Sequence, residues 1–328
     1  MDLRTFVIAN PNAGNGKVKD EWEQIERLLR TQLPTMDWAF SEGPNHATLL
    51  CREAFRDGWD MVVAVGGDGT VNEVVNGFYE KPSTEDYTFK EGWIDGPKAK
   101  ETTIHKDPVL GIIPIGTGGD FRRSVGIMGT ISDTISRLSS ESFKPCDLGK
   151  MTFIAHNGKI TSRYFANIAS AGLAGDVDKV ANSMWKGLGG KASFALASLF
   201  AWANWKNFEG EVIIDDVNQI DGSFQNVVIA NGSYFGGGMW IAPGAELDSG
   251  FLETVLIGDL TRFEAIALMK KVYDGTHVDL EKVKNYRAKK IAVKGGGVHP
   301  ILIDIDGEQP GRLPALYQVL ESPIRIVY

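Results

Sequence analysis

The segment Gly66–Thr70 packs three glycines, one carboxylate and one hydroxyl into five positions. It directly follows the apolar run Met61–Val65, and apolar residues at helical spacing come after it. Glycines at the end of a buried strand let backbone N–H groups approach a phosphate with no side chain in the way. The carboxylate of Asp68 would then face a metal ion or a reacting hydroxyl. A plain turn explains two of the glycines but not the whole set, so the segment predicts phosphate chemistry.

Two further glycine-containing segments follow apolar runs. Asn10–Lys17 comes after Phe6–Ala9, and Gly116–Asp120 comes after Val109–Ile113. The first of them matches neither the P-loop pattern nor the dinucleotide-binding fingerprint, because a lysine–serine pair and a third glycine are missing at the required spacing. It is either a plain turn or a phosphate contact, and Lys17 among small residues favours the contact.

Carboxylates supply the second part of the chemistry. Asp306 and Glu308 flank a glycine after the run Ile301–Ile305, while Asp68 and Asp120 belong to glycine segments. Acidic turn residues at strand ends are common, so neither pair is decisive alone. Together, four acids would provide the metal ligation and the base that magnesium–nucleotide chemistry on a hydroxyl acceptor needs.

The elements that must position these segments alternate between strand and helix in the first third of the chain. Asp20 and Glu23 have the spacing of a capping box and predict a helix start. Such alternation indicates a parallel, doubly wound α/β sheet. Ligands of these sheets lie beyond the carboxyl ends of the strands, so the three glycine segments should meet in one crevice. The predicted strands are Phe6–Ala9, Trp38–Phe40, Met61–Val65 and Val109–Ile113, with a helix over His46–Phe55.

From about residue 146 the pattern changes to many short apolar runs separated by glycine turns. This pattern predicts a second, mostly antiparallel, β-rich domain. Between the two patterns, residues 80–107 are polar and without a period, which predicts a surface excursion that is free to move. The predicted strands are Arg163–Ile168, Glu211–Ile214, Val227–Ala230, Leu252–Ile257, Ile291–Val293, Ile301–Ile305 and Tyr317–Leu320, with helical signal near 176–205 and at Arg262–Tyr273.

One segment of the second half, Ala192–Ala203, is uncharged and apolar on all sides. It predicts either a helix buried in the core or one that walls an acyl-chain pocket or touches lipid. With about 12 residues it is too short to span a bilayer, and it lacks the basic face of a surface-bound helix.

Composition restricts the class of protein. The 328 residues carry a formal net charge of −8, which argues against a general nucleic-acid binder. Two cysteines form neither a disulfide framework nor a metal-ligand set, so a cytoplasmic location is expected. The short apolar run near the start turns directly into loop residues, which is unlike a secretory signal, and no stretch is long enough to be a transmembrane segment.

Taken together, these segments resemble the diacylglycerol kinase/sphingosine kinase family of lipid kinases in its soluble bacterial form. The most specific match is GGDGT with the following Asn72–Gly77. The other matches are Asn10–Gly14, Gly116–Thr117 with Asp120–Phe121, Asn231–Gly232, Gly236–Gly238, Ala242–Pro243, Asp248 with Gly250, and Asp306–Glu308. The matches keep the family's order and spacing over nearly the entire chain.

The resemblance implies a two-domain fold with the active site in the cleft between the domains. It implies a nucleotide-binding α/β domain like that of NAD kinases and diacylglycerol kinases over 1–145, with a C-terminal return at about 310–328. A β-rich, sandwich-like lipid-substrate domain would occupy 146–309. ATP and Mg²⁺ are the implied cofactors.

The resemblance also implies roles for individual residues. Asp306 would be the base for the acceptor hydroxyl, with Glu308 and Asp68 orienting it and Mg²⁺, although the roles of Asp68 and Asp306 could be exchanged. Asp120 and Arg122 would contact the lipid. A structural metal would involve Asp248 and the backbone of Phe251. The implied nucleotide-binding residues are Asn10, Pro11, Asn12, Gly14, Lys17, Gly66, Gly67, Gly69, Thr70, Glu73, Gly116 and Thr117.

The chain departs from the family pattern at three positions. Gly119 stands where asparagine is usual, Ser249 where many members have a second aspartate, and Asn15 where a lysine often follows the first loop's glycine. Nucleotide binding is still the expectation, whereas these changes bear on the acceptor lipid and the structural metal.

The sequence therefore predicts an ATP- and Mg²⁺-dependent kinase that phosphorylates a hydroxyl of a diacylglycerol-like or sphingoid lipid. We expect it to meet this acceptor transiently at a membrane surface, without nucleic-acid partners, and a homodimer stays open. The alternatives are a kinase of the same superfold with a soluble acceptor such as NAD, and a catalytically silent nucleotide- or lipid-binding module.

Overall fold

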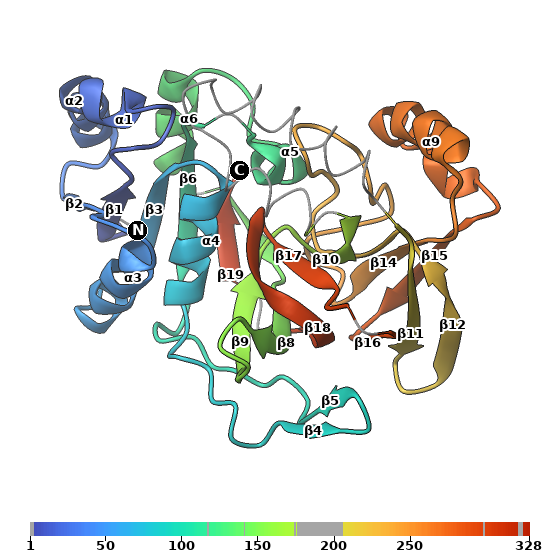
Figure 1. The fold of residues 1–328 in the computed structure, drawn as a ribbon. Coiled ribbons are helices and arrows are strands. Elements are labelled where there is room, and N and C mark those ends of the chain that lie inside the picture. The colour runs from blue at the N-terminus through green and yellow to red at the C-terminus, as the bar shows by residue number, and fades with distance from the viewer. Residues whose placement is uncertain are drawn as a thin grey trace.

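The computed structural model describes residues 3–116, 118–140, 142–173, 175, 206–297, 299–320 and 324–328. Thr117, the helical signal near 176–205 and the apolar segment Ala192–Ala203 therefore lie outside the described residues. Figure 1 shows two parts, an α/β part that contains the N-terminus and a β-rich part that carries helix α9 (Arg262–Asp274).

The α/β part is built on a six-stranded sheet with the order β2-β1-β3-β6-β19-β7. Neighbouring strands are parallel except at the edge, where β19 and β7 run antiparallel. The predicted doubly wound sheet is confirmed. Its strands are β1 (Thr5–Ala9), β2 (Asp37–Phe40), β3 (Met61–Gly66), β6 (Val109–Pro114), β7 (Phe143–Cys146) and β19 (Ile324–Val327).

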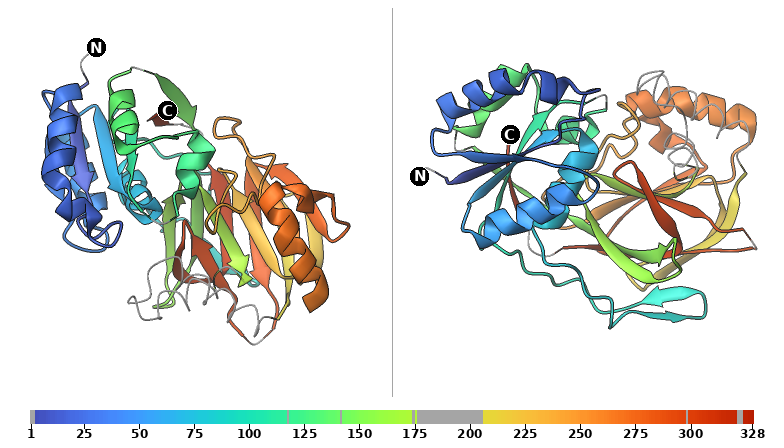
Figure 2. Two further views of the ribbon diagram at one scale, coloured as in Figure 1. Left: turned by 90° about the horizontal axis from the view of Figure 1, so that it is seen from above. Right: turned by 60° about the vertical axis from the view of Figure 1, so that its left-hand side comes forward.

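Helices cover both faces of this sheet, which explains why β3 is apolar at successive positions. Val63 and Val65 pack against α1, α2 and α6, while Val62 and Ala64 face α3 and α4. Figure 2 shows these helices as two layers around the sheet. The helices are α1 (Lys17–Asp20), α2 (Trp22–Gln32), α3 (His46–Arg56), α4 (Asp68–Gly77), α5 (Asp120–Val125) and α6 (Ile131–Leu138).

The capping box predicted at Asp20 and Glu23 is wrong. Asp20 is already the last residue of α1, and Glu21 is the N-cap of α2 without a side-chain cap hydrogen bond. Asp20 lies inside α1, whereas an N-cap residue precedes its helix and has non-helical backbone angles. Complete capping boxes occur instead at Thr130 before α6 and at Thr261 before α9.

The β-rich part is one curled antiparallel sheet of 11 strands with the main order β12-β11-β16-β18-β17-β10-β13-β14-β15. The long strand β18 also pairs with β8, which in turn pairs with β9, so the sheet folds back over its own apolar face. Its strands are β8 (Gly149–Ala155), β9 (Ile160–Phe165), β10 (Ile168–Gly172), β11 (Phe208–Ile214), β12 (Asn218–Phe224), β13 (Asn226–Ala230), β14 (Leu252–Ile257), β15 (Val283–Ala288), β16 (Lys290–Gly295), β17 (Leu302–Ile305) and β18 (Glu308–Val319). A 3₁₀ turn, η2 (Thr276–Asp279), follows α9.

Two predicted boundaries need correction in this part. The predicted strand Arg163–Ile168 is two strands, because β9 ends at Phe165 and β10 begins at Ile168. The predicted return of 310–328 covers too much chain: only β19 joins the first sheet, whereas β18 belongs to the second. An apolar run shows that a strand is buried, but not which of two sheets it joins.

Residues 80–107 do not form a free excursion. They contain a hairpin of β4 (Thr88–Lys90) and β5 (Trp93–Asp95), and Ile94 packs on Leu316 of β18. The ammonium of Lys150 on β8, which is only 3% exposed, forms an ion pair with Glu101. Ala99 of the same segment belongs to the apolar core that includes α3 and α4, so the segment contacts both parts of the molecule.

Candidate active site

The three glycine segments meet as predicted. The N–H of Asn10 donates to the carbonyl of Val65 at 3.0 Å, and the N–H of Ile115 donates to the carbonyl of Gly66 at 2.9 Å. The amide of Asn10 donates to the hydroxyl of Thr70 at 3.1 Å. These contacts place the ends of β1, β3 and β6 side by side, because parallel strands end at one edge of a sheet.

Close packing explains two of the glycines in these segments. A Cβ on Gly66 would lie 2.4 Å from the hydroxyl oxygen of Thr70, and a Cβ on Gly116 would lie 3.0 Å from the Cα of Gly67. By contrast, a Cβ on Gly67 would meet no atom closer than 3.9 Å. Gly66 and Gly116 are therefore needed for packing, while Gly67 faces free space at the strand end.

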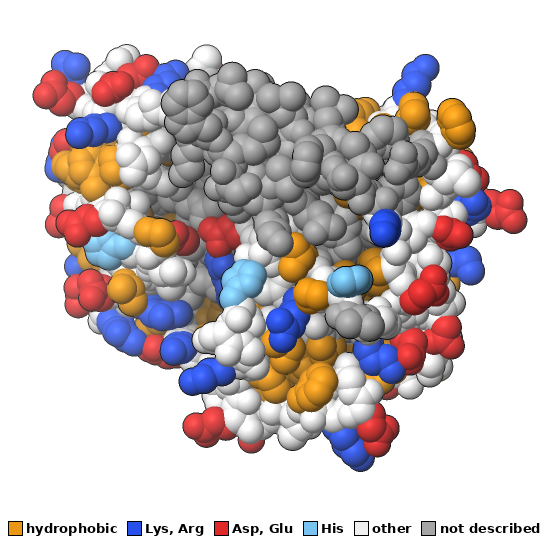
Figure 3. Space-filling view, in the orientation of Figure 1, with side chains coloured by type: hydrophobic (Ala, Val, Ile, Leu, Met, Phe, Trp, Pro, Cys, Tyr) orange, Lys and Arg blue, Asp and Glu red, His pale blue; other side chains and the backbone are white. Residues whose placement is uncertain are grey.

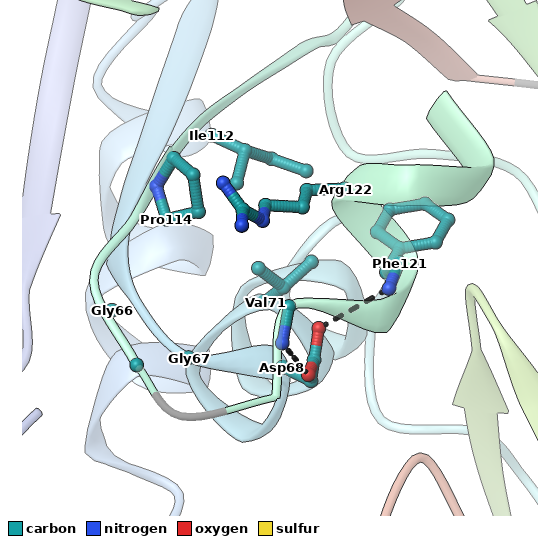
Figure 4. A pocket seen from close by; sticks show the side chains of 10 residues that line it. Gly66, Gly67, Asp68, Val71, Ile112, Pro114, Phe121 and Arg122 are labelled. Atoms are coloured by element: carbon teal, nitrogen blue, oxygen red, sulfur yellow. Dashed lines mark hydrogen bonds between the residues drawn. The ribbon is translucent and has the colours of Figure 1, made fainter. Parts of the chain in front are cut away.

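A small pocket lies between the second and third glycine segments, and Gly66, Gly67 and Gly116 line one side of it. Figure 4 shows the side chain of Arg122 reaching from α5 across this pocket toward Pro114. The cation thus stands near the strand ends, where an anionic group would be held by backbone N–H groups.

Asp68 holds the third segment in place. One of its carboxylate oxygens accepts hydrogen bonds from the N–H groups of Gly119 (2.9 Å) and Asp120 (3.3 Å), and the other accepts one from Phe121 (3.3 Å). Figure 4 shows the contact with Phe121. These donors are the otherwise unpaired N–H groups at the start of α5. Asp68 therefore joins α4 to α5.

Asp120 connects α5 to the second part of the molecule. It is buried, and its two oxygens accept from the guanidinium of Arg123 at 2.6 Å and from the N–H of Gly237 at 2.7 Å. Burial, assisted by the charge of Asp68, raises the pKa of Asp120. Both oxygens are occupied by protein donors, so in this structure Asp120 bridges the two domains, and its lipid contact stays a prediction.

Asp306 sits in a cage of donors at the turn between β17 and β18. One carboxylate oxygen accepts from the N–H groups of Asn167 (3.2 Å) and Ile168 (2.9 Å). The other accepts from the N–H of Ala166 (3.1 Å) and the amide of Asn72 (2.8 Å). Burial raises the pKa of Asp306 to about 6, and the four hydrogen bonds oppose this shift. The break between β9 and β10 thus releases three successive N–H groups for one carboxylate.

Glu308, two residues further, has a different environment. One oxygen accepts from the guanidinium of Arg163 at 2.6 Å, and the same guanidinium donates to the side-chain oxygen of Asn72 at 2.9 Å. The side chain of Glu308 is 42% exposed. Its other oxygen lies 3.9 Å from the position of a Cβ on Gly69. Glu308 therefore faces the first turn of α4 with the oxygen that accepts no hydrogen bond from any described residue.

The sequence alone did not indicate Arg163 as a functional residue, and it gave Asn72 no role. Arg163 is a charged residue at the start of the predicted strand Arg163–Ile168, which is otherwise mostly apolar. This charge was the available signal. Asn72 lies one turn into α4, at the spacing that puts it on the same side as Gly69. Together with Asn76, which exchanges hydrogen bonds with the backbone of Tyr164 on β9, it joins α4 to the β-rich part.

The remaining predicted nucleotide-binding residues lie around this centre. Asn10 begins a turn in which its side-chain oxygen accepts from the N–H of Asn12 at 3.0 Å, and Pro11 lies in that turn. Gly14 adopts a positive φ of 62°. Lys17 is half exposed and lies 3.7 Å from Glu21 in a loose ion pair, which leaves its ammonium close to solvent.

Glu73 is placed at the start of α3 rather than among the glycine segments. Its carboxylate accepts from the N–H of Ala47 at 3.1 Å. Burial raises its pKa, with the charge of Glu308 acting in the same direction. Its position supports a role in holding α3 against α4.

The predicted structural metal position lies in the loop before β14. Asp147 accepts from the N–H of Gly250 at 2.6 Å, and the neighbouring charge of Asp248 adds to the burial that raises its pKa. The hydroxyl of Ser249 donates to the carbonyl of Phe251 at 3.2 Å, so this carbonyl already has a partner. Among the described residues, no group of three or more Asp, Glu, His or Cys side chains could hold a metal ion.

Comparison with known proteins finds a matching family model for each part of the chain. Residues 4–151 match the family model of the diacylglycerol kinase catalytic domain, and residues 167–328 match that of the YegS C-terminal NAD kinase beta sandwich-like domain. A diacylglycerol kinase of Staphylococcus aureus (strain bovine RF122 / ET3-1) is 27% identical over 327 residues, which cover 99% of this chain and 92% of that protein.

Solved structures share the fold. A crystal structure from Bacillus anthracis str. Sterne covers 100% of this chain and 96% of its own, with a TM-score of 0.76 and 24% identity. The structure of yeast NADH kinase complexed with NADH covers 99% of this chain and 83% of its own, with a TM-score of 0.50 and 12% identity. No helix within the described ranges is long and apolar enough to cross a membrane.

Proposed function

Because this chain belongs to the diacylglycerol kinase family, it is a phosphotransferase with an alcohol group as acceptor, and we propose that it transfers the γ-phosphoryl group of ATP to a hydroxyl of a diacylglycerol-like lipid. The observation that carries the proposal is the meeting of three glycine segments with the Asp306–Glu308 turn at the first turn of α4. Phosphoryl transfer depends mainly on positioning and charge stabilisation, which such a centre supplies.

The first turn of α4 is the proposed site for the ATP phosphates. Its initial N–H groups have no partner within the helix, and the helix dipole adds positive potential there. Gly67 leaves the approach open, and the cation of Arg122 lies across the adjoining pocket. Asn10 and Thr70 hold the first and second glycine segments in register on either side.

Mg²⁺ is proposed to accompany the nucleotide. When bound, it would neutralise charge on the phosphates during transfer. It commonly keeps several waters and uses only one or two protein carboxylates besides the phosphates. Asp68, at the start of α4, is the carboxylate that fits such a shared site. A site of this kind needs no closed cluster of acidic ligands.

For the base, the geometry supports Glu308 better than Asp306, the residue that the sequence favoured. Both oxygens of Asp306 already accept two hydrogen bonds each, so an incoming hydroxyl would have to displace a donor. Among the described residues, only Arg163 donates to Glu308, through one of its two oxygens, and the side chain is 42% exposed. We therefore propose that Glu308 accepts the proton of the acceptor hydroxyl and that Asp306 positions the turn that carries it.

We also propose that the protein works from the cytoplasm at the surface of the membrane that contains its acceptor. Both cysteines, Cys51 and Cys146, are free and buried, which suits a reducing compartment. A diacylglycerol-like lipid is insoluble in water, so the enzyme has to collect it from a bilayer.

The deciding experiment uses ATP labelled on the γ-phosphate. The purified protein is incubated with Mg²⁺ and either a mixed lipid extract containing diacylglycerol or NAD, and products are separated into organic and aqueous phases. We expect label in a lipid product that depends on Glu308 and is strongly reduced in Glu308→Gln. Label transferred only to NAD would support the soluble-acceptor alternative, and no transfer to either acceptor would support a silent binding module.

A further inference from the structure

Helix α9 is apolar on two opposite faces. Its inner face, formed by Ala265, Leu268 and Val272, is buried against β13 and β14. Its outer face carries four large apolar side chains that are 46–86% exposed, namely Phe263, Ile266, Met269 and Tyr273. Residues three or four positions apart lie on one side of a helix, so these four form a continuous stripe. Figure 3 shows apolar side chains over α9 at the rim of the molecule.

The stability of the fold does not explain this outer stripe. The inner face and a complete capping box at Thr261 already hold α9 in place. Single exposed apolar residues are ordinary, but a contiguous apolar strip on one helix marks a surface for a partner. We call Phe263, Ile266, Met269 and Tyr273 the α9 stripe.

The charges around the α9 stripe favour an anionic partner. Lys270 is exposed and lies among the residues of the stripe, and together with Lys271 it outnumbers the exposed carboxylate of Asp274 at the same end of α9. The acidic Glu264 is neutralised by an ion pair with Lys282 at 2.9 Å. An apolar strip with lysine beside it and aromatic residues at its ends is the composition of a helix that lies in a membrane interface. Because the whole chain carries a net charge of −8, its overall charge repels anionic lipid, and attraction has to come from a local surface such as the α9 stripe with Lys270.

The α9 stripe is also connected to the active site. The N–H of Trp240 donates to the carbonyl of Val272 on α9 at 2.9 Å. Three residues earlier in the same loop, the N–H of Gly237 donates to Asp120 at 2.7 Å, and Asp120 begins α5 beside Asp68. One short loop therefore joins the back of α9 to the catalytic centre.

We propose that the α9 stripe docks this protein on the surface of an anionic bilayer, the source of its lipid acceptor. The proposal rests on the lipid kinase function, since that function requires contact with a membrane. A second copy of the chain is a poorer occupant. A helix of 13 residues is about 20 Å long and about 10 Å wide, so its face covers roughly 200 Å², against about 800 Å² per partner in a standard protein interface.

The test is co-sedimentation with vesicles of phosphatidylcholine and phosphatidylglycerol, measured without ATP. Phe263→Ser/Ile266→Ser removes two residues of the stripe. The matched control is Leu49→Ser/Val217→Ser, two apolar residues that are 52% and 81% exposed on other elements. We expect vesicle affinity to fall roughly 100-fold in the stripe variant, because each buried side chain contributes about tenfold, and to stay unchanged in the control. Lys270→Glu should weaken binding about tenfold on anionic vesicles only.

Activity distinguishes this proposal from the proposed function. The stripe variant should lose turnover of diacylglycerol embedded in vesicles but keep turnover of a dissolved short-chain diacylglycerol. The proposal is overturned if the stripe variant sediments with vesicles like the parent. It is also overturned if the parent is a dimer, the stripe variant is a monomer, and both bind vesicles equally well. If the parent binds vesicles through the stripe yet phosphorylates neither lipid, docking stands and the proposed function fails.

Discussion

Two single variants, Gly66→Ala and Gly67→Ala, should separate the effect of a glycine on stability from its effect on nucleotide binding. In Gly66→Ala the new Cβ would lie 2.4 Å from the hydroxyl oxygen and 2.8 Å from the Cβ of Thr70, so the first turn of α4 must shift. Overpacking of this kind costs about 1–3 kcal/mol. Losing the hydrogen bond between Asn10 and Thr70 adds about 1 kcal/mol. We therefore expect the free energy of unfolding to fall by about 2–4 kcal/mol.

Gly67→Ala should behave in the opposite way. Gly67 has φ −91° and ψ −174°, a conformation that alanine adopts readily, and its Cβ would meet nothing within 3.9 Å. We expect the free energy of unfolding to change by less than about 0.5 kcal/mol. The methyl group would stand where the phosphate approaches, and losing one hydrogen bond to a charged group costs about 1.5–3 kcal/mol, or roughly 10–100-fold in ATP affinity.

Both variants are measured by urea unfolding and by calorimetric titration with ATP and Mg²⁺. Gly67→Val serves as a second step, and its larger side chain should weaken ATP binding further. Parent-like ATP binding in Gly67→Ala would refute the role of Gly67 in phosphate access. Parent-like stability in Gly66→Ala would refute the role of Gly66 in packing.

Three further outcomes follow from the same structure. Glu308→Gln should lower kcat by about 10²–10⁴-fold while changing stability by less than about 1 kcal/mol, because its ion pair with Arg163 is partly exposed; a variant with near-normal turnover of lipid would contradict its role as base. Burial raises the pKa of Asp306 from 3.8 to about 6, so the folded state binds this proton more tightly than the unfolded state. The protonated carboxyl therefore adds to the free energy of unfolding below pH 3.8, and this contribution is lost as the pH rises through 6. Two pKa units correspond to about 3 kcal/mol, and urea unfolding between pH 4 and 7 should show that much extra loss in the parent relative to Asp306→Asn; equal slopes would argue against the shift. Glu101→Gln leaves the ammonium of Lys150 buried without its partner charge, which should cost about 3–5 kcal/mol; thermal unfolding that matches the parent would show that residues 80–107 do not clamp the two parts.

Local sequence patterns were sufficient for the parallel sheet and for the meeting of the glycine segments. β3 is apolar at every position up to Val65 and ends in Gly66–Thr70, so both the strand and its functional end are visible in consecutive residues. Parallel strands in one sheet bring their carboxyl ends to the same edge, and this rule placed the three segments together without any knowledge of distances. Backbone geometry is the physical reason that such predictions succeed.

Local patterns did not determine how side chains from distant segments combine. Arg163 contacts Asn72 across 91 residues and Glu308 across 145 residues, and no spacing in the sequence encodes such pairs. The break between β9 and β10 was missed for the same reason, since the N–H groups that leave the ladder there are paired by Asp306 from another strand. Whether a carboxylate is free or already paired depends on these tertiary contacts.

Helix α9 shows the same difference between what the sequence indicates and what the tertiary structure decides. The sequence indicated a helix at Arg262–Tyr273 from its apolar spacing, but not which apolar residues are buried, because both faces carry them. Only the packing of Leu268 and Val272 on the β-rich part leaves Phe263 and its neighbours on the outside. The sequence by itself thus determined the elements and the chemistry at their ends, since these depend on neighbouring residues. The tertiary structure decided which groups are paired, buried or left open to a partner, since these depend on the residues that the fold brings together.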